Sequence, residues 1–199
     1  VPGQEVNPYF IRPEVKAFGY TLSIAMGRVL LHAMSVDAVL RLLCLAAALA
    51  LPLATARLAK VLGGDPALAG ILALPLALGW PMRMGFVSFV LGLPIVLMGS
   101  AAGVLLFRER SWRRAAELAL WAMAAYAMHA FAFGFLGALT VLAWLCTGAR
   151  KVRALGLLLA ALLPATLMAA SDVMHRALSS VIERDASVPA AGISFRPLG

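Results

Sequence analysis

The sequence predicts an all-α fold, a polytopic bundle of transmembrane helices. The chain of 199 residues is 63% hydrophobic and 13% charged, with a mean hydropathy of +0.94, whereas soluble domains are roughly half apolar and a quarter charged. Long apolar stretches are separated by short basic clusters. A water-soluble core of this size has no room for so many apolar residues, so the solvent must be lipid.

Residues 1–37 are predicted to form an extracytoplasmic loop followed by an interfacial helix. The first 12 residues are polar and include Pro2 and Gly3, and Pro13 suits the first turn of a helix over 14–34. This helix carries too many polar groups for a comfortable span. We expect it to be interfacial or partly re-entrant, with a true span as the alternative. Its polar residues include Glu14, Lys16, Arg28 and His32.

Six apolar stretches follow, and the sequence marks the ends of the first one clearly. Ser35 is placed to cap it, Asp37 pairs with Arg41 at i, i+4, and Gly63-Gly64 ends it. Asp65-Pro66 opens the second helix, with an acid at the cap and proline in the first turn. The transmembrane domain is predicted at 38–170, with spans at about 38–58, 66–80, 86–107, 115–129, 130–147 and 154–170.

The basic residues predict which loops face the cytoplasm. Loops 108–114 and 148–153 are strongly basic and should both be cytoplasmic. As one straight helix, the 33 residues between them would extend about 50 Å, too long for a core of about 30 Å, and would end on the wrong side. We therefore expect a short hairpin that turns near Tyr126–Gly134. The same argument predicts a second hairpin that turns at Pro81–Gly85.

Residues 171–199 are predicted to form an extracytoplasmic amphipathic helix and tail. The helix is expected to start anew at Ser171 and to lie on the membrane surface. Asp172 is expected to cap it and to pair with Arg176 at i, i+4. Its apolar stripe consists of Val173, Met174, Ala177, Leu178, Val181 and Ile182.

Candidate binding residues gather on the extracytoplasmic side of this topology. Arg83 is the strongest, because a guanidinium between two apolar arms is costly without an anionic partner and its planar fork suits a phosphate. Contact with lipid headgroups is the alternative for Arg83. His129, together with Tyr126, either binds a ligand or closes the hairpin turn through hydrogen bonds. His32 is a further candidate, with a structural role as its alternative.

Several function classes receive no support from the sequence. Phosphate loops, nucleophile elbows and paired metal histidines are missing, so we predict neither a cofactor nor a metal site, with a divalent ion left open. The net charge of +8 comes from loops between apolar blocks, which argues against nucleic-acid binding. Cys44 and Cys146 lie in apolar runs and are expected to be buried and unpaired.

Small residues in two of the predicted spans are expected to let helices approach closely. Close packing explains these small residues without any catalytic or binding role. The residues are Gly99, Ala102, Gly103, Gly134, Gly137 and Ala138.

The stretch from Arg12 to Gly64 resembles a section of the GT-C superfamily of membrane glycosyltransferases. In such proteins a proline-led helix ends in a small loop, and an alanine-x-x-arginine-leucine pattern opens the next span, here Ala38-Val39-Leu40-Arg41-Leu42. The segments Trp80–Pro94 and Tyr126–Phe131 look like parts of bacterial multi-pass proteins related to that superfamily.

The resemblance implies a sugar transferred from a polyprenyl-phosphate carrier at the extracytoplasmic face of a bacterial inner membrane. The implied partners are membrane lipids, a polyprenyl-phosphate-linked sugar and the remainder of a longer chain. In that superfamily an acidic residue in the first extracytoplasmic loop acts as the base. That loop would lie mostly before Val1, and Glu5 is the only acid upstream of the interfacial helix. No catalytic residue is therefore assigned.

Two other functions are kept as alternatives. A section of a transporter or permease is the first, because apolar helices broken by proline are expected there. A structural membrane subunit without a site of its own is the second. The prolines in question are Pro75, Pro81, Pro94 and Pro164.

Overall fold

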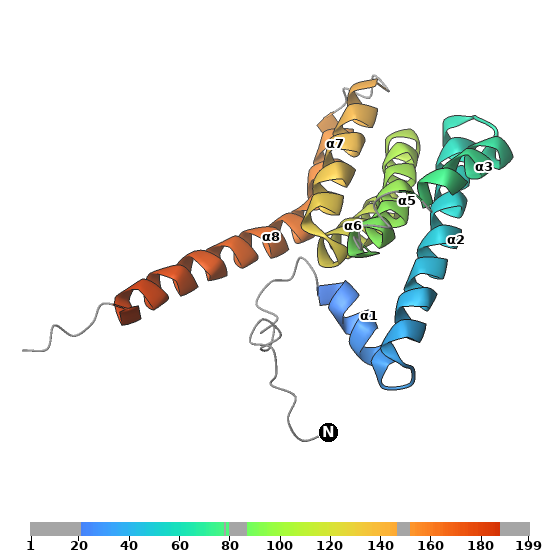
Figure 1. Ribbon diagram of the computed structural model, residues 1–199. Coiled ribbons are helices and arrows are strands. Elements are labelled where there is room, and N and C mark those ends of the chain that lie inside the picture. The colour runs from blue at the N-terminus through green and yellow to red at the C-terminus, as the bar shows by residue number, and fades with distance from the viewer. Residues whose placement is uncertain (1–20, 78, 80–86, 147–151, 188–199) are drawn as a thin grey trace, which may run out of the picture.

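The computed structural model describes residues 21–77, 79, 87–146 and 152–187. Within these residues the fold is all-α, as predicted, with seven helices (Figure 1). They are α1 (Thr21–Leu31), α2 (Val36–Leu62), α3 (Pro66–Ala77), α5 (Val87–Glu109), α6 (Trp112–Met128), α7 (Ala130–Cys146) and α8 (Val152–Ser187).

Three helical segments are long and apolar enough to cross a membrane: Val36–Leu62, Ser88–Glu109 and Val152–His175. The bilayer core requires about 20 residues of helix, whereas the apolar helices α3 and α7 have 12 and 17 residues. Large hydrophobic side chains also face outward on most helices; Phe131, for example, is 70% exposed. These features indicate an integral membrane protein, because lipid can solvate an apolar surface of this extent.

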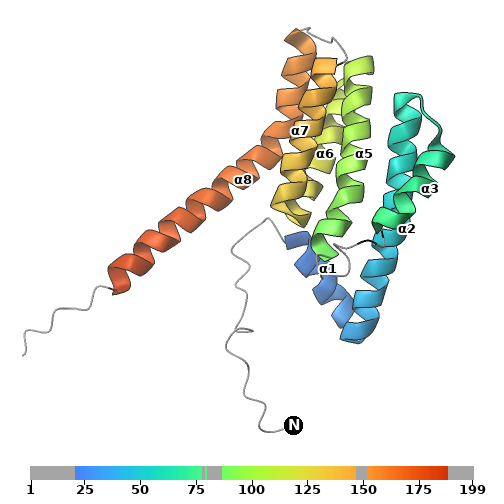
Figure 2. The ribbon, with the colours of Figure 1, turned by 45° about the horizontal axis from the view of Figure 1, so that its top comes forward.

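Helix α5 lies at the centre of the bundle. It packs against α2 on one side and against α6 and α7 on the other, and Figure 2 shows α3 on the outer side of α2. Of the apolar stretch in α5, 67% is buried, against 22% in α2 and 28% in α8. The core therefore forms around α5, and α2 and α8 leave much of their surface to lipid.

The ends of α2 follow the sequence prediction. The Ser35 side chain accepts a hydrogen bond from the backbone N–H of Ala38 at 3.4 Å, and Asp37 pairs with Arg41 at 2.8 Å. Gly63 ends the helix in the left-handed conformation at φ +86°, which glycine adopts without a steric penalty. Asp65 then caps α3 by accepting the N–H of Ala67 at 2.8 Å.

Helices α6 and α7 form the predicted hairpin, and its turn lies at His129. Extended backbone at His129, with φ −167° and ψ 128°, separates the two helices. In Figure 2, α6 runs from the end where α5 finishes to the opposite end, and α7 returns from there. The junction of α5 with α6 therefore lies at the same end of the bundle as the start of α8. We call this the basic end, and the other end, at His129, the turn end.

Helix α8 corrects the prediction for the tail. A separate helix was expected from Ser171, but α8 continues from Val152 to Ser187 without a break, and Pro164 lies inside it. Ser171 and Asp172 suggested a cap, but both lie in the middle of α8, a helix that packs on α6. Beyond the bundle α8 extends alone (Figure 1), with Val173, Met174 and Leu178 exposed.

Glycines in α5 allow the close approach of α7, but those predicted in α7 do not contribute. A Cβ atom on Gly99 would lie 2.8 Å from Leu136 Cδ1, and one on Gly103 would lie 2.8 Å from Thr140 Cγ2. No atom lies within 4 Å of the corresponding positions on Gly134 and Gly137. The contact is asymmetric, because small residues on α5 receive the larger side chains of α7.

Two smaller expectations also differ from the structure. The helix predicted over 14–34 is described from Thr21 and already ends at Leu31, because the chain turns before the cap of α2. Cys44 and Cys146 are free thiols, but Cys44 is only half-buried and Cys146 is exposed. Both lie in apolar runs of which only one face is buried, and the sequence pattern alone does not distinguish that face.

Candidate functional site

A buried pair of polar side chains connects α6 with α8. The Tyr126 hydroxyl donates a hydrogen bond of 2.9 Å to Asp172 Oδ2. Tyr126 is 5% exposed and Asp172 is 2% exposed, and Tyr126 belongs to the apolar core cluster that α6 and α8 share. Ionisable groups inside a membrane bundle are rare because they are costly, and they mark functional positions by default. This pair is therefore the centre of the candidate site.

The cap predicted at Asp172 is wrong. Asp172 was expected to cap a surface helix, yet its carboxyl group lies inside the bundle and accepts from Tyr126. The pair expected with Arg176 stays a prediction, because the side chain of Arg176 lies outside the described residues. A cap requires a helix start, and α8 has none at this position. Asp172 is thus the residue of the site that sequence analysis missed. The available signal was a carboxyl group close to the apolar run of 154–170.

His129 holds both helices of the hairpin at the turn end. Its backbone N–H donates to Ala125 O at 2.9 Å, and its carbonyl accepts the N–H of Ala132 at 2.9 Å. Its side chain Nδ1 accepts the N–H of Phe131 at 3.2 Å, as the side chain of a helix N-cap does. In the neutral ring the other nitrogen, Nε2, then carries the proton and acts as a donor.

Aromatic rings surround the imidazole of His129. Phe131 stacks on it with ring centroids 5.6 Å apart, and Phe89 of α5 meets it edge-on at 5.8 Å. Phe89 also contacts Phe135 at 6.5 Å, and Tyr126 contacts Phe133 at 5.9 Å. The turn end thus offers an imidazole in an aromatic setting.

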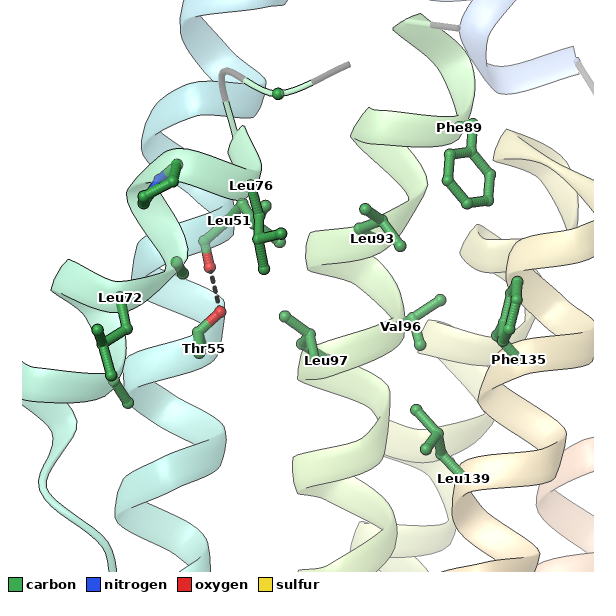
Figure 3. A pocket seen from close by; sticks show the side chains of 14 residues that line it. Leu51, Thr55, Leu72, Leu76, Phe89, Leu93, Val96, Leu97, Phe135 and Leu139 are labelled. Atoms are coloured by element: carbon green, nitrogen blue, oxygen red, sulfur yellow. Dashed lines mark hydrogen bonds between the residues drawn. The ribbon is translucent and has the colours of Figure 1, made fainter. Parts of the chain in front are cut away.

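A long apolar cavity begins beside this aromatic cluster. It has a volume of about 770 Å³ and lies between α2 and α3 on one side and α5 and α7 on the other (Figure 3). Phe89 and Phe135 line it, so Phe89 contacts both the cavity and the ring of His129. A ligand at His129 would therefore be next to an apolar chamber.

The other sequence-predicted residues fall outside this cluster. His32 is exposed in the turn after α1, where its Nδ1 lies 2.7 Å from the carbonyl oxygen of Arg28. This local contact fits the structural alternative for His32. Arg83 lies outside the described residues, so its role stays a prediction. Within the described part of the chain, no three His, Cys, Asp or Glu residues are grouped so as to hold a metal ion.

The basic end carries a separate charged network. Arg114 binds Glu109 through two hydrogen bonds of 2.8 and 2.9 Å and Glu117 through one of 2.7 Å. Glu117 also pairs with Arg57 of α2 at 3.0 Å. The bonds to Glu109 and then Glu117 raise the pKa of Arg114 above its ordinary value. This network ties α2, α5 and α6 together and has a structural explanation.

Comparison with known proteins adds no assignment. No family model, curated protein or solved structure matches this chain.

Proposed function

We propose that this chain is a section of an integral membrane glycosyltransferase-like protein that acts on a lipid-linked sugar at the turn end of the bundle. The observation that supports it most is the Tyr126–Asp172 pair, a carboxyl group inside the bundle that accepts a 2.9 Å hydrogen bond. Such a carboxyl group is expensive in lipid and favours a functional role. The resemblance to the GT-C superfamily supplies the reaction class, sugar transfer from a polyprenyl phosphate.

The topology that goes with this proposal has about six spans. The two basic connections lie at one end of the bundle, and positive residues favour the cytoplasm, so the turn end is assigned to the extracytoplasmic side of a bacterial inner membrane. In this proposal the short helices α6 and α7 cross most of the core together with their turn at His129, and α3 is a further short span. Short arms of this kind are tolerated where the turn is buried in protein or lines a cavity.

The site residues have separate roles in the proposal. His129 donates from Nε2 to an anionic oxygen of the lipid phosphate, and Arg83 supplies the compensating charge. The Tyr126–Asp172 pair fixes α8 against the hairpin, so that the wall of the site is rigid. Chemistry at the sugar is not assigned to a residue of this chain.

A transporter remains the second candidate, and it has less support. Prolines were expected to break its helices, but Pro75, Pro94 and Pro164 lie inside helices that continue past them. Half-helices with free termini, which bind ions in many transporters, are not created by these three prolines.

The experiment that tests the proposal measures binding of the lipid carrier. The chain is reconstituted in vesicles of phosphatidylethanolamine and phosphatidylglycerol and incubated with radiolabelled undecaprenyl phosphate or undecaprenyl-phosphate-linked glucose. The wild type is expected to bind the phosphate. His129→Asn should weaken binding at least tenfold at an unchanged folded amount, because asparagine keeps the cap but lacks the imidazole.

The matched control is Trp112→Ala, which removes an aromatic side chain that is 68% exposed at the opposite end of the bundle. It should bind like the wild type. A wild-type chain that does not retain undecaprenyl phosphate would overturn the proposal. If His129→Asn binds undecaprenyl phosphate with wild-type affinity, His129 is not part of the site.

A further inference from the structure

Arg110 occupies the corner between α5 and α6, at the basic end of the bundle. Its backbone has φ +50°, and no other residue except glycine has a positive φ in the described part of the chain. This left-handed conformation is costly for a residue with a Cβ atom and free for glycine. The Nε atom of Arg110 is also buried without a hydrogen-bond partner among the described residues, which is a second cost. Glycine would avoid both costs, so the fold of the corner gives no reason for an arginine.

The carboxyl groups near this corner are already engaged by other arginines. Both oxygens of Glu109 accept from Arg114, at 2.8 and 2.9 Å. One oxygen of Glu117 accepts from Arg114 at 2.7 Å, and the other accepts from Arg57 at 3.0 Å. All four oxygens thus have a guanidinium partner, and Arg110 forms no ion pair within the ranges that the structure describes.

Two exposed arginines flank Arg110. Arg108 lies in the last turn of α5, and Arg113 lies in the first turn of α6. A cation in the first turn of a helix opposes the positive end of the helix dipole, and this turn of α6 contains no acidic residue. Neither arginine forms an ion pair with another described residue. The corner thus gathers three guanidinium groups at a helix N-terminus, an arrangement that a bound anion stabilises.

The position of the corner along α5 indicates which anion is present there. Glu109 ends a segment of 22 residues that can cross a membrane, so the corner lies where the apolar core meets the lipid phosphates. Trp112 is exposed beside it, and tryptophan is enriched at this interface. A groove of about 150 Å³, lined by Trp112 and by alanines of α6 and α8, offers adjoining apolar surface to part of an acyl chain.

We propose that the corner between α5 and α6 binds the phosphate group of an anionic phospholipid through Arg108, Arg110 and Arg113. A headgroup with a net negative charge, such as that of phosphatidylglycerol, is favoured, because a zwitterionic headgroup would bring its own ammonium group toward three guanidinium groups. The site lies at the end of the bundle opposite His129 and does not depend on the proposal of sugar transfer.

Three variants separate a specific site from general attraction to basic residues. Arg110→Gln removes the charge and keeps the left-handed backbone, whereas Arg110→Gly removes the charge together with the backbone strain. Lys60→Gln is the control, because it removes one charge from an exposed position in the last turn of α2, at the same end of the bundle (Figure 2). General attraction should lose as much in Lys60→Gln as in Arg110→Gln, since each basic residue near an anionic surface contributes similarly.

The measurement is the quenching of tryptophan fluorescence by dibrominated lipids, with the full chain in phosphatidylcholine vesicles. The signal of Trp112 is obtained as the difference between each protein and the same protein with Trp112→Phe. In the wild type, dibrominated phosphatidylglycerol should quench this signal at about one fifth of the concentration required for dibrominated phosphatidylcholine. Most of this preference should be lost in both Arg110 variants, and Lys60→Gln should keep it.

Thermal unfolding of the variants distinguishes a binding arginine from a structural one. Arg110→Gly should unfold at the temperature of the wild type or above it, since glycine adopts φ +50° without a steric penalty. A preference lost in both Arg110 variants, with this unchanged or higher midpoint, would support the site. A lower midpoint in Arg110→Gly would show that the guanidinium group holds the corner together, and it would overturn the proposal.

Three results of the quenching experiment would also overturn the proposal. The first is equal quenching of the wild type by the two lipids. The second is an equal loss of preference in Arg110→Gln and Lys60→Gln, which would indicate general attraction. The third is complete reversal of the phosphatidylglycerol effect by millimolar inorganic phosphate, which would assign the corner to a soluble anion.

Discussion

The Tyr126 hydroxyl and the Asp172 carboxyl group are joined by a hydrogen bond of 2.9 Å although they are 46 positions apart in the sequence. The bond connects the end of α6 with the middle of α8, and the described side chains of α8 that follow Asp172 are exposed. In Figure 1 this later part of α8 extends beyond the bundle. It is a polar contact between two helices that also share an apolar core, and it fixes which turn of α8 faces α6.

Tyr126→Phe is expected to destabilise the bundle by about 1–3 kcal/mol, because it takes a hydrogen-bond donor away from a buried carboxyl group. Ring packing against Phe133 is retained, so the loss reports the hydroxyl alone. Unfolding in detergent micelles, followed by circular dichroism, measures it.

Thr166→Val is the control for this prediction. It also deletes a hydroxyl from the bundle, but Thr166 is exposed and its hydroxyl bonds to Leu162 O within its own helix at 2.9 Å. We expect a change smaller than that of Tyr126→Phe. Equal effects of the two variants would show that the Tyr126–Asp172 bond contributes nothing specific.

Helix ends that are set by interactions between neighbouring residues could be predicted from the sequence. The cap of α2 at Ser35, its end at Gly63 and the start of α3 at Asp65 each depend on a few neighbouring residues. The hairpin turn at His129 followed from the two basic loops and the length between them. In both cases the information lies in short-range pattern or in charge.

Contacts between helices could not be predicted in the same way. Asp172 looked like a cap because Ser171-Asp172 is a typical helix start, and only packing on α6 shows it as a buried partner of Tyr126. Likewise Gly103 and Gly137 look equivalent in the sequence, but only Gly103 meets the facing helix. Which face of a uniformly apolar helix turns inward depends on its neighbours, since there is no polar face to mark the other side.

Gly103→Ala is expected to destabilise the protein by about 1–3 kcal/mol through overpacking. The new Cβ would lie 2.8 Å from Thr140 Cγ2. Thr140 cannot turn away easily, because it is fully buried and its hydroxyl donates to Leu136 O at 2.8 Å. Gly137→Ala, which meets no atom within 4 Å, should leave the unfolding midpoint unchanged or raise it. A similar loss in both variants would contradict the packing asymmetry between α5 and α7.

Glu117→Gln is expected to lower the thermal midpoint, because it removes the charge that Arg57 and Arg114 share. The difference from wild type should shrink in 1 M salt, since salt already weakens the wild-type pairs. Asp37→Asn serves as the control, because Asp37 and Arg41 are 73% and 81% exposed within one helix and such pairs contribute little. A salt-independent loss would point to packing of Glu117 as the cause.

Arg83→Ala is expected to weaken the binding of undecaprenyl phosphate while the folded amount in the membrane stays near that of the wild type. The proposal requires this, because Arg83 is assigned to the phosphate and not to a structural ion pair. Binding is measured by retention of the radiolabelled lipid on the purified chain. If Arg83→Ala abolishes folding instead, the arginine has a structural role and is not part of the proposed site.

The topology is tested by single cysteines in a background without Cys44 and Cys146. Arg113→Cys and Arg153→Cys lie at the basic end, at exposed positions in α6 and α8, and should both resist an impermeant thiol reagent added outside intact cells. His32→Cys lies at the other end, before α2, and should be labelled. The expectation follows because α6 and α7 cross the bundle as a pair, so the chain returns to the side from which it started. If only one of the two basic-end cysteines is labelled, the hairpin is contradicted. If both are labelled and His32→Cys is protected, the bundle has the opposite orientation, and the proposed site lies on the cytoplasmic face.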